Sequence, residues 1–95
     1  MATLHIEHKI RDFATWKAAF DRFAGQRREA GVTACRIHQP HDDAVYVILQ
    51  LDFPSVQQAQ AFLGFLESRI WSMPANSPAL AGSPHARVLV EAPEQ

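Results

Sequence analysis

The feature that most constrains this chain is a change of hydrophobic period at Asp12. Before it, residues 3–10 alternate apolar and polar side chains, the pattern of a strand with one buried face. After it, four aromatic residues recur at helical spacing, and they are Phe13, Trp16, Phe20 and Phe23. Asp12 itself is typical of an N-cap, because its carboxylate accepts a free amide proton of the first turn. A helix over 13–30 with so apolar a stripe needs a sheet to pack against.

The rest of the chain predicts three more strands and a second helix. Gly31 follows the first helix where a left-handed cap is expected, and Ser55 with Gln58 has the form of a capping box. The predicted elements are strands over 32–39, 45–51 and 86–91, a helix over 55–70, and a long loop over 72–84. This β-α-β-β-α-β order predicts an α+β, ferredoxin-like fold of one domain over 1–95. Its antiparallel sheet has strand order 4-1-3-2, with both helices on one face.

The two middle strands flank a turn and predict a hairpin. The expected register places Ile37 opposite Val47 and Cys35 opposite Leu49, so that one face of the hairpin is apolar. A slip of one residue would mix the apolar and polar sets, so the pattern itself selects the register. Cys35 is therefore expected in the helix-covered core, where a thiol is inert.

Composition excludes several classes of function. A chain of 95 residues with a net charge of −1 has a small core and no basic surface for nucleic acid. It has no apolar run long enough to cross a membrane and no signal peptide, so we expect neither a nucleic-acid nor a membrane partner. A single cysteine forms no internal disulfide, which predicts a reducing, cytoplasmic location.

The sheet face away from the helices is predicted to be mixed in polarity. Its charged and polar residues are interrupted by Tyr46, Ile48 and Leu89. Because the core is small and this face is only partly polar, we expect a homodimer in which the two sheets face each other. The alternative is an exposed sheet with ordinary surface charges.

The sequence resembles small proteins of the dimeric α+β barrel superfamily. The resemblance is carried by His8-Lys9-Ile10-Arg11-Asp12-Phe13, by Trp16-Lys17 and Phe20-Asp21, and by the run from Ser77 to Pro84 that leads into Arg87-Val88-Leu89. This superfamily includes antibiotic-biosynthesis monooxygenases and various polyketide cyclases. The resemblance implies a dimeric α/β barrel and a cofactor-independent monooxygenase or cyclase that acts on an aromatic or polyketide-like small molecule. A non-catalytic dimeric module that binds a small ligand is the alternative, because this fold hosts many functions.

Metal and nucleophilic chemistry find little support in the residue pattern. The chain has five histidines, but His5 and His8 are three apart on a strand and face opposite ways. No Cys or Asp/Glu cluster has ligand spacing, and a haem site would need a larger pocket. There is also no nucleophile elbow or phosphate-binding loop. We therefore expect no metal and no cofactor.

His8 is the candidate acid–base residue, since the strand alternation places it on the helix side. We expect Phe62, Phe65 and Trp71 to form an apolar wall beside it, with Asn76 in the long loop that covers the space. A histidine titrates near pH 7, which suits it to moving a proton. The structural alternative is a histidine that only bonds backbone beside the helix cap.

A second candidate location is the opposite sheet face. There Arg36, His38 and Tyr46 can converge on an anionic or phenolic ligand inside the dimer barrel. The superfamily's cofactor-free monooxygenases bind phenol-type substrates between sheet and helices with Trp, Asn, Tyr and Arg side chains. This chain has those residue types at Trp71, Asn76, Tyr46 and Arg36. The sequence leaves both locations open.

Overall fold

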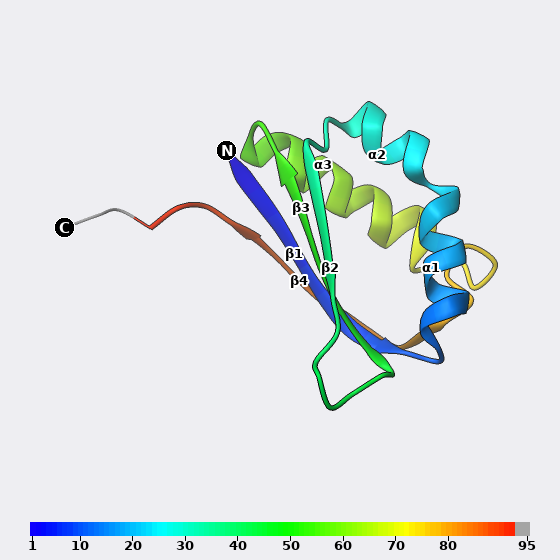
Figure 1. The fold of residues 1–95 in the computed structure, drawn as a ribbon. Coiled ribbons are helices and arrows are strands. Elements are labelled where there is room, and N and C mark those ends of the chain that lie inside the picture. The colour runs from blue at the N-terminus through cyan, green and yellow to red at the C-terminus, as the bar shows by residue number, and fades with distance from the viewer. Residues whose placement is uncertain (93–95) are drawn as a thin grey trace.

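The computed structural model describes residues 1–92, which form one layer of helices on one antiparallel sheet (Figure 1). The elements are β1 (Ala2–Ile10), α1 (Phe13–Arg22), α2 (Ala24–Ala30), β2 (Ala34–His38), β3 (Tyr46–Phe53), α3 (Val56–Phe65), a π-helical turn η1 (Leu66–Ile70) and β4 (Leu80–Leu89). The sheet order is β2-β3-β1-β4, the expected order read from the other edge. The predicted α+β, ferredoxin-like fold is therefore confirmed.

The first helix begins as predicted but is shorter than predicted. The Thr15 amide donates to the Asp12 carboxylate at 2.7 Å, and this bond lowers the pKa of Asp12. A continuous helix over 13–30 is wrong, because the chain breaks at Phe23 into α1 and α2. The carbonyl of Phe20 accepts from the Phe23 amide and from the Arg27 guanidinium, which interrupts the helical hydrogen-bond ladder. The second segment ends at the expected left-handed Gly31, with φ of 95°.

The predicted hairpin register is wrong by two residues. In the structure Ile37 faces Leu49 and Cys35 faces Leu51. A shift of two keeps every side chain on its expected face, since alternation has period two. In the observed register the Gln39 side chain bridges the loop, donating to the Ala44 and Tyr46 carbonyls at 2.9 and 3.0 Å.

Cys35 is exposed, so its predicted place in the core is also wrong. Cys35 lies on the helix side of β2, but β2 is an edge strand, and no residue of α2 is buried. The helix layer therefore covers this edge of the sheet only loosely.

The second long helix is capped by Ser55 as predicted, since its hydroxyl accepts from the Gln58 amide at 3.2 Å. Its last turn differs from the prediction. After Phe65 the helix widens into η1, where the Trp71 amide donates to the Leu66 carbonyl five residues earlier, at 2.7 Å. π-Helical turns of this kind are frequent at functional sites.

The predicted 72–84 loop is shorter in the structure, because β4 begins at Leu80 rather than at residue 86. Leu80 and Ala81 already pair with β1, and the register then shifts. The shift absorbs Gly82, with φ of 80°, and Pro84 in a bulge on this edge strand. A bulge on an edge strand tolerates a proline that lacks an N–H, so these residues look like a loop in sequence.

The core lies between the sheet and the helices. Its most buried large side chains come from the two central strands, and they are Leu4, Ile6, Val47, Leu51 and Phe53. The loop that leads to β4 is anchored to this core by buried Ala79, whose carbonyl accepts from the Arg11 amide at 2.8 Å. Across residues 1–92, no helix has the length and apolar character needed to span a membrane.

Candidate functional site

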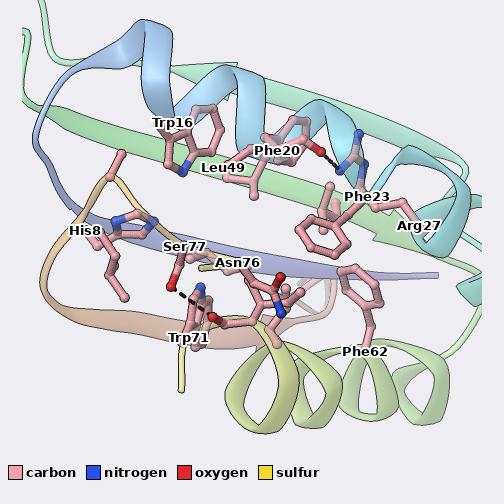
Figure 2. Close-up of a pocket in the computed structure, with 17 residues that line it drawn as sticks. His8, Trp16, Phe20, Phe23, Arg27, Leu49, Phe62, Trp71, Asn76 and Ser77 are labelled. Carbon is pink, nitrogen blue, oxygen red and sulfur yellow. Dashed lines mark hydrogen bonds between the residues drawn. The ribbon is translucent and has the colours of Figure 1, made fainter. Parts of the chain in front are cut away.

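A narrow pocket lies between the sheet, α1, α3, η1 and the covering loop, which we define as residues 71–79 (Figure 2). Its cavity volume is about 70 Å³, enough for a few water molecules. Apolar and aromatic side chains make up most of its lining, and Figure 2 shows rings entering from the helices on both sides. Few polar groups reach it, so each of them has a large influence on what it can bind.

His8 lies at one end of this pocket and is 5% exposed. Its Nδ1 is 2.9 Å from the Lys9 carbonyl, and since a carbonyl only accepts, Nδ1 carries the hydrogen. Burial lowers the pKa of His8, which favours the neutral ring with an unprotonated Nε2. No fully buried side-chain nitrogen or oxygen within residues 1–92 lacks a hydrogen bond. Nε2 has no protein partner there, so it keeps some accessible surface on a residue that lines the pocket, and it can accept a proton.

The covering loop is fastened by side-chain hydrogen bonds to the end of η1. Asn76 donates its amide to the Arg69 carbonyl at 2.8 Å, and the Ser77 hydroxyl donates to the Ile70 carbonyl at 2.9 Å. Both side chains line the pocket, as does half-buried Trp71 (Figure 2). The wide turn η1 sets where Ile70 and Trp71 enter the pocket, and nothing in the local sequence pattern indicated it.

The expected wall residues divide between two places. Phe62 lines the pocket, but Phe65 does not. The Phe65 ring stacks against Phe62 with centroids 5.6 Å apart and lines a shallow groove between α2 and α3. Phe65 is therefore not part of the pocket wall, and it packs against the wall residue Phe62 from outside the pocket.

Two further wall residues come from the aromatic stripe of the first helix. Trp16 and Phe20 both line the pocket and stack with centroids 4.9 Å apart. The stripe predicts both rings to be buried. This is correct for Trp16, which belongs to the core, whereas Phe20 is only half-buried and packs against it.

Arg27 was missed as a pocket residue. Its guanidinium carbon lies 3.6 Å from the centroid of the Phe20 ring, and Nη1 donates to the Phe20 carbonyl at 2.6 Å. Burial lowers its pKa, although this group stays protonated at neutral pH. The sequence signal for it is the spacing of four from Phe23, which continues the aromatic stripe.

On the opposite side of the sheet, which we call the open face, polar side chains bond one another. The Tyr46 hydroxyl donates to Glu7 at 2.6 Å, and the other oxygen of Glu7 lies 2.8 Å from His5 Nε2. Gln50 Nε2 approaches His5 Nδ1 at 3.1 Å. The hydrogen bonds from Tyr46 and His5 lower the pKa of Glu7, while its bond to Glu7 raises the pKa of Tyr46.

The same network continues through an ion pair. Arg36 donates to both oxygens of Asp52 at 2.8 and 2.9 Å and reaches Gln50 at 3.3 Å. Thr3 also donates to Asp52 at 2.8 Å, and these bonds lower the pKa of Asp52 to about 2. The open face therefore holds a bonded network in which most charges already have partners.

The three residues expected to converge on the open face do not meet. Arg36 faces Gln50, and Tyr46 lies four residues along β3 from that position, about 13 Å away. His38 is exposed. Among residues 1–92, no three His, Cys, Asp or Glu side chains are grouped as metal ligands would be.

The fold and its single helix layer define a ferredoxin-like α+β protein. Solved structures with this fold include SnoaB, a cofactor-independent oxygenase from Streptomyces nogalater, with a TM-score of 0.72 and 13% identity over 98% of this chain and 94% of that one. They also include a monooxygenase from the gene ActVA-Orf6 of Streptomyces coelicolor, in complex with nanaomycin D (TM-score 0.64, 18% identity, 99% and 89% covered). A third is a dimeric ferredoxin-like protein from an uncultured marine organism (TM-score 0.60, 9% identity, 96% of each chain).

No protein-family profile matches the sequence, and no curated protein matches it either. At these identities the structural likeness establishes the fold. For a single chain, the ferredoxin-like fold implied by the resemblance to antibiotic-biosynthesis monooxygenases is confirmed in this way.

Proposed function

We propose that the protein is a cofactor-independent monooxygenase that oxidises a phenol-type aromatic molecule in the pocket between sheet, helices and covering loop. The observation that carries the proposal is His8, a buried neutral imidazole whose Nε2 is unbonded beside an aromatic-lined space. Two proteins of the same fold are described as a cofactor-independent oxygenase and as a monooxygenase. That description applies to those proteins and supports the reaction class proposed here.

In the proposed reaction, Nε2 of His8 accepts the phenol proton, and the phenolate is oxidised by molecular oxygen at a ring C–H position. One oxygen atom forms the new C=O bond of a quinone, and the other leaves as water with the two hydrogens that the substrate loses. One phenol and one O₂ thus give one quinone and one water. The protein contributes a base, an orientation between rings and the exclusion of bulk water.

Proton transfer to His8 is uphill, and this limits the substrate. A simple phenol has a pKa near 10, whereas the pKa of His8 is lowered from 6.5. The gap of at least ~3.5 pKa units corresponds to about 5 kcal/mol, which an enzymatic barrier can contain. Phenols made more acidic by a carbonyl on the ring should therefore react faster.

The covering loop must move for such a ligand to enter. The pocket holds about 70 Å³, less than the ~150 Å³ of an engineered cavity that binds benzene. The loop is exposed along 72–75 and is fastened by the side chains of Asn76 and Ser77. Movement of the loop tip would require release of these two bonds and of the bond from Arg22 to the Ala75 carbonyl, while the Arg11–Ala79 bond could keep the end of the loop on the core.

The small cavity also favours a second candidate function, a dimeric module that binds a small ligand without turnover. In that case His8 would act only as a hydrogen-bond acceptor for the ligand. The two functions differ in whether oxygen is consumed.

We also infer that two copies pair through the open face to form a dimeric barrel. Ile48 is half-buried and Leu89 is 40% exposed on that face in a single copy, and apolar side chains there gain by pairing. A protein of the same fold is described as dimeric. A solution mass equal to one chain at micromolar concentration would contradict the dimer.

The exposed thiol of Cys35 fits a reducing, cytoplasmic location.

Turnover of 1,5-dihydroxynaphthalene tests the reaction, because its oxidation to 5-hydroxy-1,4-naphthoquinone obeys the stoichiometry above. We expect the protein to accelerate quinone formation with uptake of one O₂ per quinone, and His8→Gln to slow it about 10²–10⁴-fold. His41→Gln is the matched control and should keep the full rate, since His41 is exposed in the turn between β2 and β3, away from the pocket and from both sheet faces. A His8→Gln variant at full rate would contradict the role of His8. Binding without turnover would favour the second function.

A further inference from the structure

We propose that the ligand of this pocket carries a carboxylate, which Arg27 binds at the end of the pocket away from His8. The inference rests on the proposed function for the site and names the class of substrate: a planar phenol with an anionic group on the far side of its ring system. Figure 2 shows Arg27 and His8 at opposite ends of the pocket, with the aromatic rings between them.

Arg27 is held in place but remains largely unpaired. Of the five N–H groups of its guanidinium, one donates to the Phe20 carbonyl. None of the ion pairs among residues 1–92 includes Arg27, and the carboxylate that affects its pKa, Asp21, is bonded to Lys17. Arg27 is half-buried, so its charge is partly desolvated without an anion to compensate it.

The orientation of the guanidinium suits an anion. The Phe20 ring, 3.6 Å away, supports its flat face, and the bond to the Phe20 carbonyl fixes one edge. A planar fork with a fixed orientation binds a carboxylate through two parallel hydrogen bonds at little entropic cost. The remaining donors belong to a residue that lines the pocket.

A purely structural role would explain only part of this geometry. The bond to Phe20 stabilises the break between α1 and α2, and one N–H is sufficient for it. The neighbouring cations differ from Arg27. Arg28 is exposed and does not line the pocket, and Arg22 lies over the Phe23 ring and donates to the Ala75 carbonyl. Arg27 is therefore the cation that a ligand in this pocket meets.

A matched pair of probes separates charge recognition from ring binding. 6-Hydroxy-2-naphthoate carries a phenol and a carboxylate at opposite ends, and 6-hydroxy-2-naphthamide has the same shape without the charge. We expect calorimetry on the full chain to give a dissociation constant at least tenfold lower for the carboxylate. In Arg27→Met this preference should disappear while the amide binds as before. Arg28→Met is the control and should keep the preference.

Two further measurements, on Arg27→Lys and at raised ionic strength, test the preference for the carboxylate probe. A purely structural role of Arg27 would leave this preference unchanged. The lysine keeps the charge but loses the fork, so we expect a reduced preference that weakens further as ionic strength rises. This variant also serves if Arg27→Met proves unfolded by its melting curve.

The outcomes distinguish the two proposals. If both probes bind the wild type equally, or the preference survives Arg27→Met, the carboxylate inference is overturned while the pocket stands. If Arg36→Met rather than Arg27→Met removes the preference, the anion binds on the open face and the inference is overturned as well. If neither probe binds, the proposed site is wrong and the inference falls with it.

Discussion

The pocket and the open face lie on opposite sides of one sheet and differ in how far their polar side-chain atoms are hydrogen-bonded. On the open face, polar side chains bond to one another in a continuous network of Thr3, His5, Glu7, Arg36, Tyr46, Gln50 and Asp52. In the pocket, His8 and Arg27 each use one nitrogen on a backbone carbonyl and leave other nitrogens without a partner in residues 1–92. A saturated network has little left to offer a ligand, whereas unsatisfied groups around an apolar space can bind one.

The two regions also differ in what shifts the pKa values of their ionisable groups. Hydrogen bonds on the open face stabilise charged forms, so the pKa of Asp52 falls to about 2 and that of Glu7 is lowered. Burial in the pocket instead disfavours charge, so the pKa of His8 and that of Arg27 are both lowered. The contrast favours a structural role for the open face and supports the proposal that His8 is the proton acceptor.

The largest expected effect is on the pocket wall. Trp16→Ala should lower the free energy of unfolding by ~3–5 kcal/mol, because Trp16 is 9% exposed and contacts both Phe13 and Phe20. Trp71→Ala should cost less, since Trp71 is only half-buried in the covering loop. Chemical denaturation measures both. A loss below about 1 kcal/mol for Trp16→Ala would mean that Trp16 lies at the protein surface. The pocket would then not be a buried region that differs from the open face.

The next effect concerns the open face. Asp52→Asn should lower the free energy of unfolding by about 1–2 kcal/mol, because it weakens bonds from Arg36 and Thr3. Exposure of the Arg36 side chain, 42%, keeps the effect modest. A double-mutant cycle with Arg36→Met would isolate the pair. Affinity for the naphthoate probe should not change in either variant, and a loss of affinity would show that the two regions are not separate.

Much of the fold follows from short-range patterns. The caps at Asp12, Ser55 and Gly31 were predictable, because a cap depends on residues within one turn. The start of β4 was not, because Gly82 and Pro84 are loop residues that a bulge accommodates inside a strand. That pairing is decided by β1, which is distant in sequence.

The site was predictable only where alternation decides it. His8 falls on the helix side because strand residues alternate, and the structure places it there. The open-face network was missed because it depends on cross-strand register, and the observed shift of two residues places Arg36 opposite Gln50. Arg27 was missed because its place depends on a helix break that its own side chain helps to stabilise.

The smallest expected effect is the pH dependence of His8, and its sign follows from the direction of the shift. The pKa of His8 is lowered in the folded protein by burial, so below pH 6.5 the unfolded chain binds this proton more readily than the folded one. Stability should therefore be fully present above pH 6.5 and fall as the pH drops from 6.5 through the lowered pKa. Each unit of lowering corresponds to about 1.4 kcal/mol.

His8→Gln isolates this contribution. The carboxylates with lowered pKa values, such as Glu7 and Asp52, lose their contributions only below about pH 4.5, so they leave the window above it clear. Denaturation between pH 5 and 7.5 should show a stability that falls toward acid in the wild type and less steeply in His8→Gln. Oxidation rates should decline over the same acid range as Nε2 becomes protonated. Equal slopes in the wild type and His8→Gln would mean that the pocket does not shift the titration of His8. The contrast in pKa shifts between the pocket and the open face would then be wrong.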